Sequence, residues 1–379
     1  MVSFTFAAPG QVVFGAGRAA ELPRLVGGLG ASPFVLTGSA PERSRALLES
    51  LGSPAFHRTP HEPTLQDVRD AVAAARDHGA DVVVGIGGGS VIDAAKAVAA
   101  LAATGADPLD HIEVIGRGQR LPAASLPCVA VPTTAGTGAE MTANAVLASP
   151  EHGVKASLRD TAMLPRVALV DPLLTVDCPP AVTAASGMDA VTQCLEPFVS
   201  LHANPLTDGF CREGLRRAGT ALRRAFADGS DLEARTGMAL CAALSGLALA
   251  NAKLGAVHGF AGPLGGMIDA PHGAICAALL PAVCRVNVRA LRERDPSNPA
   301  LTRYEVAGEL LTGVFGLHPL LGWVEDAVAE FRIPSLRDLG LTDALIDEAC
   351  AKARAASSMA GNPIRLTDDE LREILITAL

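Results

Sequence analysis

Three polar side chains in the second half of the chain, one carboxylate and two imidazoles, are of the types that bind a metal. Asp189 and Gln193 lie four residues apart in a predicted helix, so the two side chains share one helix face. His258 stands in an otherwise apolar stretch, and His272 follows Pro271 where the next predicted helix begins. A carboxylate and two imidazoles suit Zn²⁺ or Fe²⁺ and leave a position open for a substrate. A lone histidine in an apolar helix is also typical of a buried core residue, so the spacing alone leaves both interpretations open.

A glycine-rich loop at residues 85–90 follows a Val-rich run and precedes an Ala-rich amphipathic stretch. Glycines let backbone amides and a helix N-terminus come close to a pyrophosphate. This strand–loop–helix context favours cofactor binding over a purely structural turn. The loop does not follow the first strand of the chain, which argues against an ordinary Rossmann dehydrogenase. The candidate cofactor residues here are Gly87, Gly88, Gly89 and Ser90.

A second polar loop spans residues 132–140 and also follows a Val-rich strand. The small hydroxyl side chains of Thr133, Thr134 and Thr137, together with two glycines, suit contact with a ribose or a nicotinamide. A wide turn held by local Thr-to-backbone hydrogen bonds explains the same residues equally well.

The elements that must position these residues change character near residue 178. In the first half, short Val-rich strands alternate with helices, which predicts a parallel sheet covered by helices on both faces. The first half is therefore expected to be an α/β nucleotide-binding domain over residues 1–178, with Thr64 as the N-cap of one of its helices. The predicted strands are 34–37, 81–86, 129–131 and 167–170, and the predicted helices are 41–51, 64–78 and 90–102.

The second half carries helical apolar spacing with many Ala and Leu residues and no convincing strand. It is expected to be an all-α domain over residues 179–379. Helix ends are predicted at Gly229, at residues 263–266 and at Pro334. The predicted helices are 180–201, 205–227, 232–261 and 273–290.

Composition excludes several other classes of function. The 31 basic and 40 acidic residues are interspersed and sum to a net charge of −9, so the basic stripe that a nucleic-acid partner needs is missing. The most apolar uncharged run, residues 237–252, is shorter than the about 20 residues of a membrane-spanning helix. Eight cysteines are scattered singly, which is typical of a reducing compartment. With no secretory signal at the start, the expected location is the cytoplasm.

Taken together, these segments resemble the iron-containing (group III) alcohol dehydrogenases, which are related to glycerol dehydrogenase and maleylacetate reductase. The resemblance runs from residues 12–17 through both loops to the Gly-Met-Asp-Ala at 187–190, Pro-His-Gly at 271–273 and Asn-Pro at 362–363. It implies the dehydroquinate synthase-like architecture: NAD or NADP on the N-terminal domain and a divalent metal, Fe²⁺ or Zn²⁺, on the helical domain. It also implies a small alcohol or aldehyde as substrate and a homodimer or larger homo-oligomer.

The resemblance also assigns roles to single residues. Gly87, Gly88, Gly89 and Ser90 resemble the family's pyrophosphate motif, and Asp93 resembles the acidic residue that closes it. The loop with Thr133 and Thr134 is similar to the one that runs along the dinucleotide, and Lys155 is similar to a basic residue near the nicotinamide. Asp189, His258 and His272 match three of the family's four metal ligands and are the expected catalytic residues.

Three positions depart from the family pattern. Gln193 stands where the family has its second metal ligand, a histidine. Its amide oxygen is a weaker, neutral ligand, so either Gln193 binds the metal or the site has three protein ligands and water, as in glycerol dehydrogenase, and zinc becomes plausible beside iron. Gly262 replaces an active-site histidine, which enlarges the expected pocket. Gly38 replaces an Asp that reads the ribose 2′-hydroxyl, so NADP should be tolerated unless the glycine merely makes a turn.

The expected reaction is reversible hydride transfer between an alcohol and its aldehyde or ketone, with the metal acting as a Lewis acid on the substrate oxygen. One alternative is a metal-independent reductase of the maleylacetate type. A second is a lyase like dehydroquinate synthase, which needs several Lys and Arg around its substrate, whereas the segments 186–196 and 254–273 offer only Lys253 at their edge. A third is a nucleotide-binding scaffold without catalytic activity.

Overall fold

The computed structural model describes residues 3–52, 54–121 and 125–379. Contacts divide the chain into two compact units. The α/β unit comprises residues 7–134 and 138–177. The helical unit comprises residues 178–379, the segment that ends at Phe6, and the short stretch 135–137. The helical unit therefore begins where the sequence changes character but takes in two segments from the first half of the chain.

A six-stranded parallel sheet forms the centre of the α/β unit, as the sequence predicts. Its strand order is β1-β8-β5-β4-β2-β3. All four predicted strands are confirmed to within one or two residues, and β1 and β3 are added at the two edges. The strands are β1 (Val12–Phe14), β2 (Pro33–Thr37), β3 (Ala55–Arg58), β4 (Val82–Gly87), β5 (Cys128–Pro132) and β8 (Val167–Val170).

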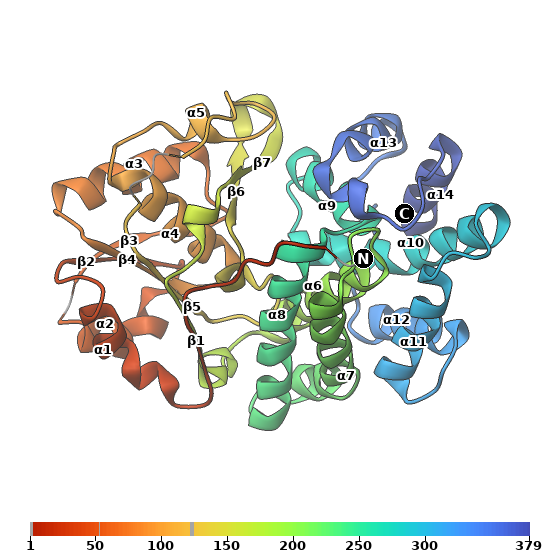
Figure 1. The fold of residues 1–379 in the computed structure, drawn as a ribbon, viewed down its shortest axis with the longest axis horizontal. Coiled ribbons are helices and arrows are strands. Elements are labelled where there is room, and N and C mark those ends of the chain that lie inside the picture. Colours follow the sequence, from red (N-terminus) through yellow and green to blue (C-terminus); the bar gives the residue numbers. More distant parts are fainter. Residues whose placement is uncertain (1–2, 53, 122–124) are drawn as a thin grey trace. The chain divides into compact units, whose positions relative to one another are not determined.

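Helices pack on both faces of this sheet (Figure 1). One face buries Leu36 and Val83 against α3 (Leu65–Asp77) and α4 (Gly89–Ala102). The opposite face buries side chains such as Val35 and Val84 against α1 (Leu22–Gly27), and α2 (Arg45–Ser50) packs at that cluster. Thr64 caps α3 in a capping box with Asp67, which confirms the predicted N-cap. The remaining elements of this unit are α5 (Pro108–His111) and the unpredicted antiparallel hairpin β6 (Asn144–Ser149) and β7 (Val154–Arg159).

The helical unit consists of helices only, apart from short 3₁₀ turns, over residues 178–379. Its core is built mainly from Ala, Leu, Val and Cys side chains, as expected from the few aromatic residues of the chain. The helices are α6 (Pro180–Val199), α7 (Pro205–Ala227), α8 (Leu232–Ala252), α9 (Ala256–Met267), α10 (His272–Arg294), α11 (Ala300–Thr312), α12 (Leu317–Glu330), α13 (Ile346–Ala355) and α14 (Asp368–Ala378).

One helix prediction is wrong. Residues 232–261 were expected as a single helix that continues to a stop at 263–266, but the chain breaks instead at Lys253, whose φ is 59°. Pro263 lies inside α9. A proline removes one backbone hydrogen bond from a helix, but Phe260 and Leu264 are fully buried, and their packing holds the helix through that position. The break matters because it places His258 in the first turn of a new helix.

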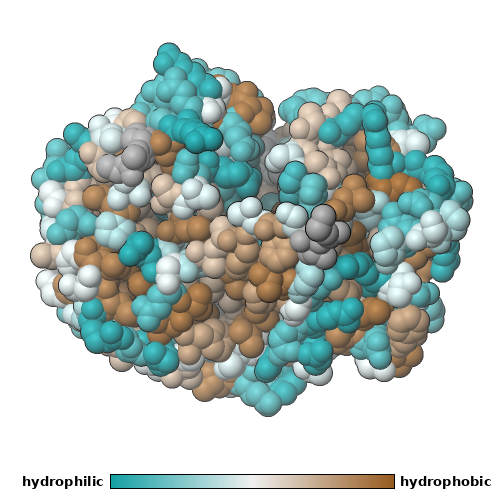
Figure 2. All heavy atoms as spheres, in the orientation of Figure 1, coloured by the Kyte–Doolittle hydropathy of each residue, from teal (hydrophilic) through white to brown (hydrophobic). Residues whose placement is uncertain are grey.

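Two helices, α8 and α10, are long and apolar enough to cross a membrane by length and composition. In this fold 61% and 78% of their most apolar stretches are buried inside the protein. Such burial is what the core helices of a folded domain show. On the face drawn in Figure 2, hydrophilic and apolar residues are interspersed.

A buried acid lies in the loop after β5. Glu140 belongs to the short 3₁₀ turn Ala139–Met141 and is 3% exposed. Burial raises the pKa of this carboxyl to about 7, although its own backbone N–H and the charge of Lys96 act in the opposite direction. Lys96 is also fully buried, and its ammonium donates to Ala139 O and Thr142 Oγ1 at 2.8 Å each.

The pKa of Glu140 is higher in the folded chain than the ordinary value of 4.5. The buried carboxyl is neutral at low pH, and the folded chain loses stability as the pH rises from 4.5 to about 7, because the folded state disfavours the ionised form. We expect Glu140→Gln to remove this loss. At pH 8 the variant should be more stable than the wild type by about 3 kcal/mol, and at pH 5 by less than about 1 kcal/mol. Urea unfolding at both pH values measures the difference. The exposed Glu49→Gln is the control, and an equal gain at both pH values would contradict the prediction.

Candidate active site

The first part of the site is one face of α6. Asp189, Gln193 and Glu196 are spaced by four and three residues, so they share a helix face, and all three are buried. Gln193 Nε2 donates to Asp189 Oδ2 at 2.7 Å. A carboxylate only accepts hydrogen bonds, so it holds the amide with its nitrogen toward Asp189 and its oxygen turned away.

The second part is the first turn of α9, which Glu196 ties to α6. Glu196 Oε1 accepts from Val257 N at 2.7 Å, so it caps one of the free N–H groups of that turn. Glu196 Oε2 accepts from His258 Nδ1, also at 2.7 Å. Since Nδ1 carries the proton, the other ring nitrogen, Nε2, faces Asp189, with 3.2 Å between Nε2 and Oδ1. The helix break therefore positions His258 as well as starting α9.

The third part is the start of α10. His272 is the first residue of this helix and Cys276 lies four residues later, so the two side chains are neighbours on one face. His272 reaches the cluster through Nε2, which lies 3.9 Å from Asp189 Oδ1. Its side chain is 35% exposed, whereas those of Asp189 and His258 are 1% and 6% exposed. His272 therefore marks the side from which solvent reaches the cluster.

Non-glycine residues with positive φ stand at both ends of α9: Lys253 before it at 59° and Asp269 after it at 47°. Such backbone costs free energy and persists only where the surrounding structure enforces it. Here the two breaks bring three separate helices to one point.

Four donor atoms meet there, one each from Asp189, His258, His272 and Cys276, and all lie within 4.8 Å of one another. Cys276 Sγ is 3.6 Å from His272 Nε2 and 3.8 Å from His258 Nε2. The three residues singled out in the sequence for a metal are thus brought together, and a thiol joins them.

The charges around this cluster favour a cation. Burial lowers the pKa of His272, but its interactions with Cys276 and with the carboxylate of Asp189 outweigh this effect and raise the pKa to about 9. The pKa of His258 is raised well above its usual value for the same reason, with Glu196 adding to the effect. Burial raises the pKa of Asp189, but the hydrogen bond from His258 and the charge of His272 keep it below its usual value.

The residues present fit a divalent metal ion. Carboxylate, imidazole and thiolate are the ligands of zinc and of related transition metals. Gln193 Oε1 is one of three buried side-chain atoms without a hydrogen-bond partner among the described residues. An unpartnered buried oxygen beside a carboxylate is a further donor that a bound cation would use.

Two residues of the site were not predicted. Glu196 shares the face of Asp189, and Cys276 shares the face of His272, so helical spacing offered a signal for each. Neither signal was decisive, because a cysteine in an apolar helix is usually a core residue and a glutamate is usually exposed.

Most of the candidate cofactor residues lie at the carboxyl edge of the sheet in the α/β unit, in the loops after β2, β4 and β5. Thr37 at the end of β2 pairs with Ile86, and Gly87 at the end of β4 pairs with Pro132 of β5, so the loops after these three strands emerge side by side. Thr133 N donates to Gly87 O at 2.9 Å. Ligands of open α/β sheets bind at this edge.

The glycines at this edge differ in whether packing requires them. A Cβ on Gly87 would lie 2.5 Å from Val91 Cγ2, so packing requires that glycine. A Cβ on Gly88 would meet nothing closer than Thr134 Oγ1 at 3.5 Å, and one on Gly38 would meet only Val91 at 3.8 Å. Neither Gly88 nor Gly38 has a φ that demands glycine. The chain therefore leaves space there that it does not itself fill.

The residues around this space are of the types that bind a dinucleotide. Gly88 is the N-cap of α4, so Gly89 and Ser90 present free amides at a helix N-terminus. Ser90, Thr133 and Thr134 are half-buried, and Thr37 Oγ1 is another buried atom without a partner among the described residues.

Three other predicted cofactor residues have partners within the protein. Asp93 pairs with Lys96 at 3.0 Å and accepts from Val146 N at 2.9 Å, which ties α4 to the hairpin. Lys155 pairs with Glu62. Thr137 belongs to the stretch 135–137 of the helical unit. Their contact with a cofactor stays a prediction.

Comparisons with known proteins identify the family. Residues 9–172 match the model described as iron-containing alcohol dehydrogenase, and residues 183–379 match the model of the C-terminal domain of the same family. The chain is 37% identical to 1,3-propanediol dehydrogenase of Klebsiella pneumoniae over 83% of its own length and 80% of that protein. It is 34% identical to 4-hydroxybutyrate dehydrogenase of Cupriavidus necator over 90% and 89% of the two chains.

Solved structures agree with this result. A crystal structure of 1,3-propanediol oxidoreductase superposes with a TM-score of 0.90 at 31% identity and covers 100% of both chains. Sulfoacetaldehyde reductase from Bifidobacterium kashiwanohense, solved in complex with NAD⁺, has a TM-score of 0.88 at 27% identity over 100% of this chain and 99% of that one. The predicted architecture and family are therefore confirmed. The chain belongs to the iron-containing alcohol dehydrogenase family of oxidoreductases, which act on alcohols.

Proposed function

We propose that this protein is a divalent-metal-dependent dehydrogenase that transfers hydride between a small or linear primary or secondary alcohol and NAD or NADP. The observation that carries the proposal is the convergence of Asp189, His258 and His272 from three helices on one buried point. Gln193 stands at the position of the family's remaining ligand, and its Oε1 has no hydrogen-bond partner among the described residues. The cation would be Zn²⁺ or Fe²⁺.

The bound metal would polarise the substrate oxygen as a Lewis acid, and the nicotinamide would accept or supply the hydride. The protein's own residues prepare the site for this chemistry. Asp189 contributes a buried negative charge. Glu196 accepts the Nδ1 proton of His258 and so leaves the Nε2 lone pair directed at the cluster. Glu196 also fixes the start of α9, so the position of His258 does not depend on a loop.

The space near the cluster supports a substrate without bulky groups close to the reacting carbon. Gly262 lies one helical turn after His258, and a Cβ built on it would meet nothing within 4 Å. The relatives act on 1,3-propanediol and 4-hydroxybutyrate according to their names, and both are short linear alcohols. The cytoplasmic location and the homo-oligomeric state stay predictions.

Asp189→Ala and His272→Ala should each remove the metal and the activity. Metal analysis of the wild type should find about one Zn²⁺ or Fe²⁺ per chain, and both variants should lose most of it. Alcohol oxidation should fall on the order of 10³-fold, because several kcal/mol of transition-state stabilisation are lost. The exposed Asp326→Ala is the matched control. Unchanged metal content and activity in both variants would overturn the metal's role, and activity that survives strong chelation would favour a metal-independent reductase.

Gly38→Asp should shift the protein from NADP toward NAD. The structure has room for the side chain, and a carboxylate there would repel a 2′-phosphate and accept a hydrogen bond from a 2′-hydroxyl. We expect kcat/KM for NADP to fall at least about tenfold relative to that for NAD. Gly38→Asn, of equal size but uncharged, should change the ratio much less. If the wild type already rejects NADP as strongly as Gly38→Asp does, Gly38 does not set the preference.

Glu196→Gln should weaken metal binding without removing a ligand. Glutamine can accept at only one of the two oxygen positions, so either Val257 N or His258 Nδ1 loses its acceptor. Loss of such an outer partner typically lowers metal affinity about 10- to 100-fold. Competition with a chromogenic chelator measures the affinity, and the exposed Glu309→Gln is the control. An affinity equal to that of the control would show that Glu196 only stabilises the helix.

A further inference from the structure

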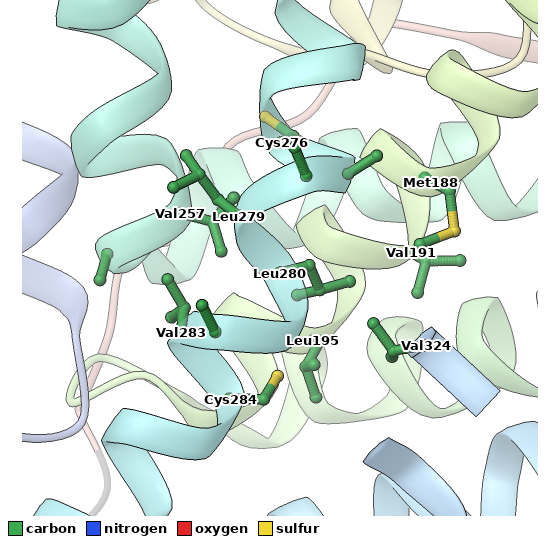
Figure 3. Close-up of a cluster of buried hydrophobic side chains, with 14 of the residues drawn as sticks. Met188, Val191, Leu195, Val257, Cys276, Leu279, Leu280, Val283, Cys284 and Val324 are labelled. Atoms are coloured by element: carbon green, nitrogen blue, oxygen red, sulfur yellow. The ribbon is translucent and has the colours of Figure 1, made fainter. Parts of the chain in front are cut away.

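Cys276 is placed unlike an ordinary core cysteine. Its sulfur lies within 4 Å of the Nε2 atoms of both His258 and His272. Cys284, two turns further along the same helix, belongs to the same hydrophobic core as Cys276 but has no such histidine contact among the described residues. Figure 3 shows both residues on α10, with the Cys276 sulfur directed away from Leu280 and Val283. One helix thus carries one cysteine of each kind.

The spacing of the donor atoms is that of ligands around one ion. With zinc–sulfur and zinc–nitrogen bonds of about 2.3 and 2.05 Å, a tetrahedral site separates S from N by about 3.6 Å, and N from a carboxylate O by about 3.4 Å. The observed Sγ–Nε2 distances are 3.6 and 3.8 Å. The observed Nε2–Oδ1 distances are 3.2 and 3.9 Å. Four of the six donor–donor distances are thus close to those of a single coordination tetrahedron, and the other two are below 4.8 Å.

Gln193 is a weaker candidate for the fourth ligand. Its amide nitrogen is engaged with Asp189 Oδ2, and a neutral amide oxygen is a weaker donor than a thiolate. A thiolate together with Asp189 would also balance the charge of a divalent ion in a buried site, which a neutral amide cannot do. Both considerations favour the cysteine as the fourth ligand.

We propose that Cys276 Sγ, rather than Gln193 Oε1, is the fourth protein ligand of the metal, and that this makes an Asp–His–His–Cys site which favours zinc over iron. The inference rests on the metal site of the proposed function and changes its ligand set. On binding, the Cys276 S–H bond breaks, the proton passes to solvent, and a metal–sulfur bond forms. Some catalytic zinc sites expand from four to five ligands during the reaction, and substrate binding here requires such an expansion.

Cobalt spectroscopy tests the ligand directly. The metal-free protein is titrated with Co²⁺ alone, and a thiolate ligand produces a sulfur-to-cobalt charge-transfer band in the near ultraviolet. We expect this band in the wild type, in Gln193→Leu and in the matched control Cys284→Ala. Cys276→Ser should lose the band while still taking up about one Co²⁺, with affinity reduced at least about tenfold.

The outcomes separate this inference from the proposed function. Cobalt uptake by the wild type without the band, or a band that persists in Cys276→Ser, would overturn the cysteine ligand and leave the metal site standing. No cobalt uptake by the wild type would overturn both. Loss of the band in a folded Gln193→Leu would also overturn the assignment of the fourth position. X-ray absorption of the zinc-loaded wild type needs no variant: one sulfur at about 2.3 Å would support the proposal, and only nitrogen and oxygen neighbours would refute it.

Discussion

The hydrogen bonds of Glu196 are the interaction on which the rest of the site depends. One carboxylate on α6 accepts from the backbone of Val257 and from the ring of His258. A buried carboxylate is costly unless it is fully hydrogen-bonded, and the free N–H groups of a helix start supply what it needs. The break before α9 and the buried acid therefore require each other. Together they set which ring nitrogen of His258 faces Asp189.

The need to balance buried charge also governs the cluster of Asp189, His258, His272 and Cys276. Asp189, Glu196 and Cys276 surround two imidazoles in a site that is almost closed to solvent. Without a cation, the imidazoles must carry the compensating positive charge, and for this reason their pKa values are raised. A divalent ion would supply that charge instead. The arrangement is thus a physical reason for metal binding that does not depend on the likeness to other proteins.

The carboxyl edge of the sheet in the α/β unit differs from the metal cluster, because the chain leaves space there. Gly87 is required by contact with Val91, but Gly38 and Gly88 leave room that no protein atom fills, and Thr37 Oγ1 is left without a partner. Its buried charges are used to hold the unit together: Lys96 joins α4 to the loop after β5, and Asp93 joins α4 to the hairpin. A sequence motif in this unit therefore mixes residues that face a ligand with residues that hold the fold.

The sequence by itself determined four central strands of the sheet but not its edge strands β1 and β3, because apolar periodicity acts over a few neighbouring residues. It also determined the helices 205–227 and 90–102, the glycine loop and three of the cluster residues. It misplaced the break near Lys253 and passed over the hairpin 144–159, Glu196 and Cys276. Local propensity favours a stop at Pro263, and only packing of Phe260 and Leu264 overrides it. Whether a buried cysteine faces leucines or imidazoles depends on which helices pack beside it. That was decided by tertiary structure, since residues 18 and 87 positions apart in the chain meet there: His258 with Cys276, and Asp189 with Cys276.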